Sequence, residues 1–281
     1  NVVVIGGGTA GLEAACTAAE VGCNTFLLEK GNELGGLASL ISKIPAKNRL
    51  ADFPHYLMHR AEQLDNLYIF KNTEGTPENI RKFHPNIIVS STGSAPLLPP
   101  IAGLKDRIDN ENHNIYSILG MISHINDFPK DLKGKKVVVV GGGAVGLDVV
   151  EFFADRNADI SIVEMMDQIG RDLDPVSKND TKTMMKKHNV HQLTKTALLE
   201  VKDSSFLVRG EGEPYELPFE YGFVCLGMRA QGQLYQNLTE EFSSEDVEIM
   251  NIGDSQRARR IIDGTQEGRN ILTILEQKGY L

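Results

Sequence analysis

The sequence predicts an α/β protein in which one pattern of strand, glycine turn, helix and strand occurs twice. Two observations predict this class. A glycine-rich turn follows an apolar strand at Gly6 and again at Gly141. Each helix then leads to a second apolar strand that ends in an acid, Glu29 or Glu164, at the same distance from the first glycine. We therefore expect two Rossmann-like domains built on parallel sheets.

Each copy has the residue types and spacing of a dinucleotide-binding βαβ unit. The first glycine allows the tight turn, the second lets the backbone approach a pyrophosphate, and the third lets the helix pack close to the sheet. The helix N-terminus offers N–H groups to the phosphates, and the acid accepts hydrogen bonds from ribose hydroxyls. A glycine turn in an ordinary α/β protein does not explain the repetition. The residues predicted to contact the two dinucleotides are Gly6, Gly8, Thr9, Ala10, Gly11, Glu29 and Lys30 in the first copy, and Gly141, Gly143, Ala144, Val145, Gly146 and Glu164 in the second.

The other elements of the first half follow from apolar runs and turn residues. The first βαβ unit occupies residues 1–30, and apolar residues at helical spacing predict a helix over 48–65. Apolar runs predict strands at 68–70 and 87–93, the second ending in glycine. The prolines within 96–100 break regular structure and indicate a linker.

The second half repeats this order. Its predicted elements are the second βαβ unit, a helix, a group of short strands and an apolar strand that also ends in glycine, at 136–164, 175–188, 189–209 with 215–219, and 223–227.

The last segment has no counterpart in the second copy. It contains a strand at 247–254 and a terminal helix at about 264–278. We expect it to complete the first domain, so that the second domain is inserted into the first. The predicted domains are residues 1–103 with 236–281, and residues 104–235.

Composition argues against several partner classes. The 281 residues carry a formal net charge of −9, which disfavours nucleic acid and anionic membrane surfaces. No apolar run reaches the ~20 residues of a membrane span. The three cysteines have neither metal-ligand nor redox spacing, which fits a reducing cytoplasm, and the seven histidines are scattered. We predict a cytoplasmic protein with no metal site.

The ordered motifs resemble the two-dinucleotide-binding flavoproteins of the pyridine nucleotide-disulfide oxidoreductase superfamily. The resemblance covers nearly the whole chain. It implies FAD in the first unit, NADH or NADPH in the second, and an aspartate of a Gly-Asp motif on the flavin ribitol. The further binding residues that it implies, or that mirror them in the second copy, are Gly36, Leu37, Thr92, Gly93, Gly227, Gly253 and Asp254.

A finer resemblance is to the C-terminal region of the 2,4-dienoyl-CoA reductase, enoate reductase and trimethylamine dehydrogenase group. It rests on residues 34–45, 163–170 and 253–268. In that group a flavin-binding barrel with a cysteine-bound iron–sulfur cluster precedes this region. The resemblance therefore implies an upstream FMN and Fe–S barrel domain as a partner in the same polypeptide. Because the chain opens on Asn1, one residue before a predicted strand, we expect a fragment of such a protein.

Two residue patterns depart from the superfamily. Ser91 stands where alanine is usual, which is a conservative change. The paired cysteines of true disulfide reductases are missing after Gly36, so thiol–disulfide chemistry is not expected.

The predicted reaction is hydride transfer from NADH to FAD. The cofactors would carry this chemistry, so we predict no catalytic side chain. We expect NADH to be preferred over NADPH, because Glu164 would bond both ribose hydroxyls and repel a 2′-phosphate.

Three functional hypotheses stay open. The chain could be the reductase module of a larger enzyme, a free-standing NADH oxidoreductase that uses quinone, dye or oxygen, or a nucleotide-binding protein without turnover. A longer gene product with an upstream cysteine cluster would select the first, and a start codon near Asn1 would favour the second. Nucleotide binding without flavin reduction would select the third.

Overall fold

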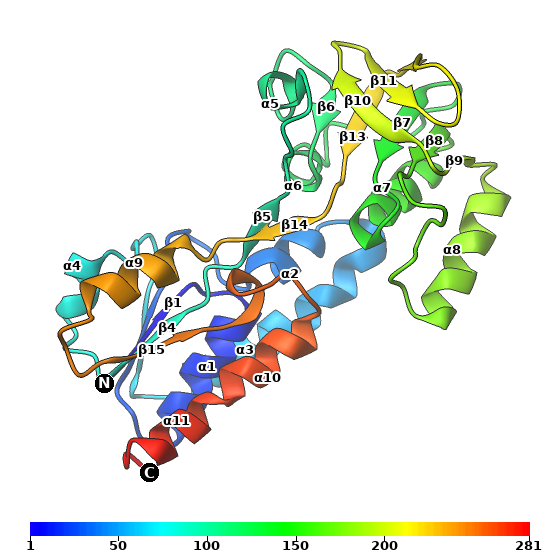
Figure 1. The fold of residues 1–281 in the computed structure, drawn as a ribbon. Coiled ribbons are helices and arrows are strands. Elements are labelled where there is room, and N and C mark those ends of the chain that lie inside the picture. The colour runs from blue at the N-terminus through cyan, green and yellow to red at the C-terminus, as the bar shows by residue number, and fades with distance from the viewer. The chain divides into compact units, whose positions relative to one another are not determined.

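The computed structural model describes residues 1–281, which form two compact units (Figure 1). Unit 1 contains Asn1–Lys43, Lys47–Ala95 and Arg229–Leu281. Unit 2 contains Ile44–Ala46 and Pro96–Met228. The second unit is thus an insertion into the first. The two main boundaries between the units come earlier in the chain than the boundaries predicted from sequence. They fall within two short strands that pair with each other, β5 (Ser94–Pro96) and β14 (Met228–Ala230).

Unit 1 is built on a parallel sheet of five strands in the order β15-β4-β1-β2-β3. Its strands are β1 (Val2–Ile5), β2 (Thr25–Leu28), β3 (Leu67–Phe70), β4 (Ile87–Ser90) and β15 (Glu248–Asn251). Its helices are α1 (Thr9–Glu20), α2 (Gly36–Ile41), α3 (Asp52–Glu62), α4 (Pro77–Arg81), α9 (Gln233–Glu241), α10 (Ile261–Arg269) and α11 (Ile271–Gln277).

Helices cover both faces of this sheet. Successive strand residues point to opposite faces, and in β1 the residues on both faces are apolar. Val2 and Val4 lie in a buried cluster with residues of α1, α3 and α11. Val3 and Ile5 lie in another cluster, with residues of α4 and α9. Figure 1 shows α4 and α9 on the opposite side of the sheet from α1, α3 and α11. The β1 strand is therefore buried on both faces, and its carboxyl end is held in place where the glycine turn begins.

Unit 2 contains a second parallel sheet in the order β6-β13-β7-β8-β9 and an antiparallel sheet of β10, β11 and β12. The parallel strands are β6 (Ile115–Tyr116), β7 (Lys136–Val140), β8 (Asp159–Val163), β9 (His191–Leu193) and β13 (Tyr221–Val224). The antiparallel strands are β10 (Ala197–Val201), β11 (Ser205–Arg209) and β12 (Tyr215–Pro218). The helices are α5 (Leu104–Arg107), α6 (Ile118–Ser123), α7 (Ala144–Ala154) and α8 (Pro175–Lys187).

The antiparallel sheet packs on the parallel sheet of unit 2. Phe206 of β11 lies in one buried cluster with Val138 and Val140 of β7. Phe153 of α7 packs on Phe223 of β13, with the ring centroids 4.7 Å apart. The β7 strand thus has a covered environment like that of β1.

The predicted fold class is confirmed: two parallel α/β sheets are present, and β15 joins β4 in the first sheet. Two predicted helices were wrong in extent. Residues 45–51 form a 3₁₀ helix and α3 begins only at Asp52, which places Pro54 in the first turn, where its missing N–H is tolerated. The terminal helix is two helices that meet at Asn270.

Candidate dinucleotide-binding sites

The first glycine of each fingerprint makes a turn that requires glycine. Gly6 has φ +102° and Gly141 has φ +110°. A Cβ at Gly6 would collide with the carbonyl oxygen of Ser91, and a Cβ at Gly141 with that of Cys225. Both glycines therefore let the turn cross close to the neighbouring strand end.

The third glycine brings each helix onto its own turn. A Cβ at Gly11 would collide with the carbonyl oxygen of Gly6, and one at Gly146 with that of Gly141. The two βαβ units therefore have the tight helix packing that the sequence predicts.

The middle of each turn is open. A Cβ at Gly8 or Gly143 would meet no atom within 4 Å. These residues precede Thr9 and Ala144, the first residues of α1 and α7. A phosphate group can approach the backbone and the helix N-terminus there without a side chain in the way, so both cradles fit a dinucleotide pyrophosphate. In the first copy Gly8, Thr9 and Ala10 are half-buried, whereas Gly143 and Ala144 are exposed and Val145 is half-buried in the second.

The two acids hold the same position in the two units. Glu29 accepts hydrogen bonds from the backbone N–H of Gly7 and of Gly31, both at 2.7 Å. Glu164 accepts them from Gly142 at 2.6 Å and from Met166 at 2.7 Å. Each carboxylate is thus fixed beside its glycine turn, with acceptor capacity left for ribose hydroxyls.

A later glycine closes each turn from the other side, which the sequence reasoning missed. The N–H of Gly35 donates to the carbonyl of Gly7 at 2.7 Å, and the N–H of Gly170 donates to the carbonyl of Gly142 at 2.8 Å. Both segments carry the finer family resemblance, but this resemblance does not predict the two hydrogen bonds. It could have been suspected, because Gly35 and Gly170 follow their acids at equal distances.

The other predicted contacts of the first loop are spread around it. Gly36 has φ +57°, and a Cβ there would lie 2.9 Å from the Cα of Gly8. Leu37 follows it on α2 and is half-buried, whereas Lys30 is exposed. The structure thus brings Gly36 to the glycine turn and leaves Lys30 at the surface.

The strand ends beside the turns differ between the units. The Ser91 hydroxyl donates to the carbonyls of Ile5 at 2.8 Å and Gly6 at 3.0 Å, so it joins the ends of β1 and β4. The Thr92 hydroxyl donates to the carbonyl of Gln231 at 2.7 Å, and Gly93 has φ +74°. The Ser91 hydroxyl thus has a structural role that the interpretation of Ser91 as a conservative replacement of alanine does not predict.

In unit 2 the corresponding strand, β13, is followed by Cys225 and Gly227. Cys225 is buried, and burial raises the pKa of its thiol to about 12. Gly227 is exposed with φ +102°. Burial likewise raises the pKa of the Cys16 thiol to about 11. Both thiols stay protonated at neutral pH, which makes them poor nucleophiles.

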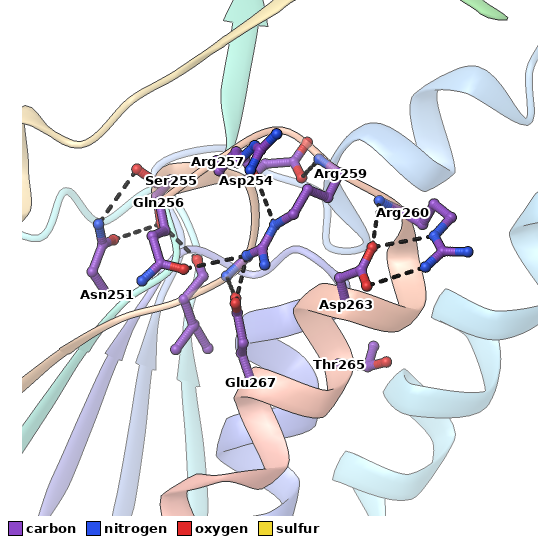
Figure 2. A network of polar contacts seen from close by, with 12 residues as sticks. Asn251, Asp254, Ser255, Gln256, Arg257, Arg259, Arg260, Asp263, Thr265 and Glu267 are labelled. Carbon is purple, nitrogen blue, oxygen red and sulfur yellow. Dashed lines mark hydrogen bonds and ion pairs between the residues drawn. The ribbon is translucent and has the colours of Figure 1, made fainter. Parts of the chain in front are cut away.

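The Gly-Asp motif belongs to unit 1 alone and lies beside the first helix. Gly253 has φ +66°, and a Cβ there would lie 2.8 Å from the Cβ of Ala10. Asp254 accepts a hydrogen bond from the Ser94 hydroxyl at 2.9 Å. It accepts another from the backbone N–H of Arg259 at 3.0 Å (Figure 2). The structure therefore brings Asp254, 160 residues from Ser94 in sequence, to the strand end near the first glycine turn.

No group of three or more histidine, cysteine, aspartate or glutamate side chains is arranged to hold a metal ion. All three cysteines are free. No helix combines the length and apolar content of a membrane span.

The sequence profile of the family described as pyridine nucleotide-disulphide oxidoreductase matches residues 1–249. The chain belongs to this family. It is similar to an NADH oxidase from Thermoanaerobacter brockii, with 28% identity over 269 residues that cover 95% of this chain. The match covers 40% of that relative, so the chain spans well under half of its length.

Two solved structures share the fold of this pyridine nucleotide-disulphide oxidoreductase. A 2-naphthoyl-CoA reductase in complex with 2-naphthoyl-CoA aligns with a TM-score of 0.80 and 24% identity, over 96% of this chain and 39% of its own. The histamine dehydrogenase from Rhizobium sp. 4-9 aligns with a TM-score of 0.82 and 18% identity, over 96% of this chain and 40% of its own. Family and relatives together support an oxidoreductase module that binds FAD and a nicotinamide nucleotide.

Proposed function

We propose that this chain transfers hydride from NADH, bound at the glycine turn of unit 2, to FAD, bound at the glycine turn of unit 1. The observation that carries the proposal is the duplicated turn. Each unit has an open cradle at Gly8 or Gly143 and a fixed acid at Glu29 or Glu164. FAD supplies a two-electron acceptor for the hydride, and the protein supplies binding and orientation.

Unit 1 is the proposed FAD site because it has contacts beyond a bare dinucleotide turn. Asp254 lies in a loop against Ala10, and both carboxylate oxygens are oriented by hydrogen bonds from Ser94 and Arg259. A carboxylate held in this way can still accept hydrogen bonds from ribitol hydroxyls. The half-buried cradle at Gly8 also suits a cofactor that stays bound.

Unit 2 is the proposed site of NADH, which must exchange in every turnover. Its cradle at Gly143 and Ala144 is exposed. Glu164 is fixed beside the glycine turn, and in this proposal it faces the adenosine ribose of NADH. It is followed by the exposed apolar side chains of Met165 and Met166. A fixed negative charge beside the ribose favours a free 2′-hydroxyl over a phosphate.

We further propose that the chain is the reductase module of a larger enzyme. The solved relatives named for 2-naphthoyl-CoA and histamine are longer, and this chain corresponds to 39% and 40% of them. In this proposal an upstream domain with FMN and an Fe–S cluster receives the electrons, and the protein resides in the cytoplasm. A free-standing NADH oxidase is the second candidate, because the relative from T. brockii carries that name.

The test is to load the 281-residue chain with FAD and to follow dye and alkene reduction separately. We expect NADH-dependent reduction of ferricyanide or a tetrazolium dye. We expect no reduction of an enoate or an enoyl thioester, because three cysteines, two of them buried, cannot supply the four thiolates of an Fe–S cluster. Reduction of an activated alkene by this chain alone would contradict the module proposal.

A further inference from the structure

A closed ring of polar contacts holds the loop that carries Asp254. Glu267 of α10 accepts a hydrogen bond from the backbone N–H of Gly253 at 2.7 Å. Its other carboxylate oxygen forms a short ion pair with the guanidinium of Arg259 (Figure 2). The side chains of Arg259 and Glu267 are only 29% and 22% exposed, so solvent screens the pair incompletely.

Arg259 connects Glu267 to several residues of the loop through hydrogen bonds. Its guanidinium donates to the carbonyl of Arg257 at 3.2 Å and to the side-chain oxygen of Gln256 at 3.3 Å. Its own backbone N–H donates to Asp254 at 3.0 Å. One residue therefore links the carboxylate of Asp254 to the carboxylate of Glu267 on the helix.

The loop needs such an anchor because of its backbone. Gly253 is in the left-handed region with φ +66°, and glycine has more conformational freedom than any other residue. Without the Glu267 contact, the N–H of Gly253 and the guanidinium of Arg259 would lose their shared acceptor. The direction of the Asp254 carboxylate would then depend on two hydrogen bonds only, from the Ser94 hydroxyl and from the backbone N–H of Arg259 in the same loop.

We propose that the Arg259–Glu267 ion pair is a positioning device for the flavin half of FAD, acting through Asp254. The inference rests on the proposed FAD site in unit 1. It predicts a selective effect: weakening the pair lowers affinity for FAD but not for ADP, because ADP lacks the ribitol and flavin that Asp254 would address. A purely structural role would change both affinities together or neither.

The chain offers a matched control one residue further on. Arg260 and Asp263 form a second ion pair at the start of α10, with Nε of Arg260 and Oδ2 of Asp263 3.3 Å apart. The hydrogen bonds of their side chains run between these two residues, and the Arg260 side chain is 82% exposed. Asp263→Asn therefore removes a similar charge without touching the Gly253–Asp254 loop.

The experiment titrates flavin-free protein with FAD and, separately, with ADP by calorimetry. We expect Glu267→Gln to weaken FAD binding about tenfold, in line with the loss of one charge-assisted contact, and to leave ADP binding within about twofold. Asp263→Asn should change neither. Arg259→Gln is the second variant, should Glu267→Gln fail to fold, and carries the same expectation.

Three results separate the possible failures. Equal losses of FAD and ADP affinity in Glu267→Gln, or no loss of either, would overturn the positioning role. If Asp254→Asn weakens FAD selectively and Glu267→Gln does not, this inference alone fails. If the parent chain binds no FAD, the proposed function fails and this inference fails with it.

Discussion

Gly7 in unit 1 and Gly142 in unit 2 make the same pair of hydrogen bonds. Each N–H donates to an acid, Glu29 or Glu164, and each carbonyl accepts from a later glycine. The turns before them also share a left-handed first glycine pressed against a strand end. The nucleotide loop is therefore one local structure that the chain builds twice, because the same residues recur at the same spacing.

The surroundings of the two loops differ. The first loop has Gly253 against Ala10, and Asp254 beside Ser94. In unit 2 the place of β15 is taken by β6, a strand of only two residues that precedes the glycine turn in sequence, and an antiparallel sheet covers one face of the parallel sheet. We therefore propose that the shared βαβ unit provides dinucleotide binding in both units, and that the elements around it determine which dinucleotide each unit holds.

The largest effect is expected when the equivalent glycine is substituted in each unit, which tests the assignment of one nucleotide to each site. Gly8 and Gly143 have φ −74° and −78°, with ψ −178° in both, so valine fits either backbone. Neither new side chain would meet protein atoms at its Cβ. We expect Gly8→Val to weaken FAD binding by at least about a thousandfold, roughly 4 kcal/mol, and Gly143→Val to do the same to NADH.

Each variant is the control for the other. Calorimetric titration should show Gly8→Val with normal NADH affinity and Gly143→Val with normal FAD affinity. Loss of FAD in Gly143→Val, with its NADH affinity intact, would reverse the assignment of the two sites.

The next comparison concerns the acid of the second loop. Glu164 should disfavour NADPH by about a hundredfold in catalytic efficiency, on the order of 2–3 kcal/mol, through repulsion of the 2′-phosphate and loss of its ribose hydrogen bonds. Steady-state dye reduction with each nucleotide measures the ratio. Glu164→Ser should narrow it at least tenfold. Equal efficiency with NADH and NADPH in the parent would contradict this account.

Part of this arrangement could be predicted from sequence because it is local. The first and third glycines, the acids and their strands follow from spacing within about 25 residues. The partners of Asp254 could not be predicted: Ser94 lies 160 residues away, and the bond from Arg259 depends on loop geometry. Glu267 was missed because a glutamate on a helix surface has no pattern that distinguishes an anchor from a solvated charge.

A smaller effect is expected at the ion pairs that Glu13 makes with Arg60 and Arg269, which we call the clamp. Glu13 of α1 is 5% exposed and pairs with Arg60 of α3 at 3.0 Å and with Arg269 of α10 at 3.2 Å. Glu13→Ala should lower the free energy of unfolding by about 2 kcal/mol, less than for an isolated buried pair, because Arg60 keeps Glu20 as a partner. Urea denaturation measures it, and a change below about 0.5 kcal/mol would show that the clamp is not stabilising.

The same clamp predicts a modest pH dependence. Hydrogen bonding to Arg60 lowers the pKa of Glu20 below its ordinary value of 4.5. Since the folded-state pKa is depressed, this stabilisation is present above about pH 4.5 and is lost as the pH falls towards the folded-state pKa. The parent should therefore lose more stability than Arg60→Met between neutral pH and pH 4. Parallel stability curves for the two proteins would refute the link.

The central claim is that one chain brings two nucleotides into one redox reaction, and anaerobic stopped-flow mixing of the FAD-loaded chain with NADH tests it most directly. We predict bleaching of the visible flavin absorption at a rate that saturates with NADH concentration. In Gly143→Val the bleaching should need far more NADH, while the flavin content stays normal. Stable binding of both nucleotides with no loss of flavin colour would contradict the account and leave a nucleotide-binding protein without turnover.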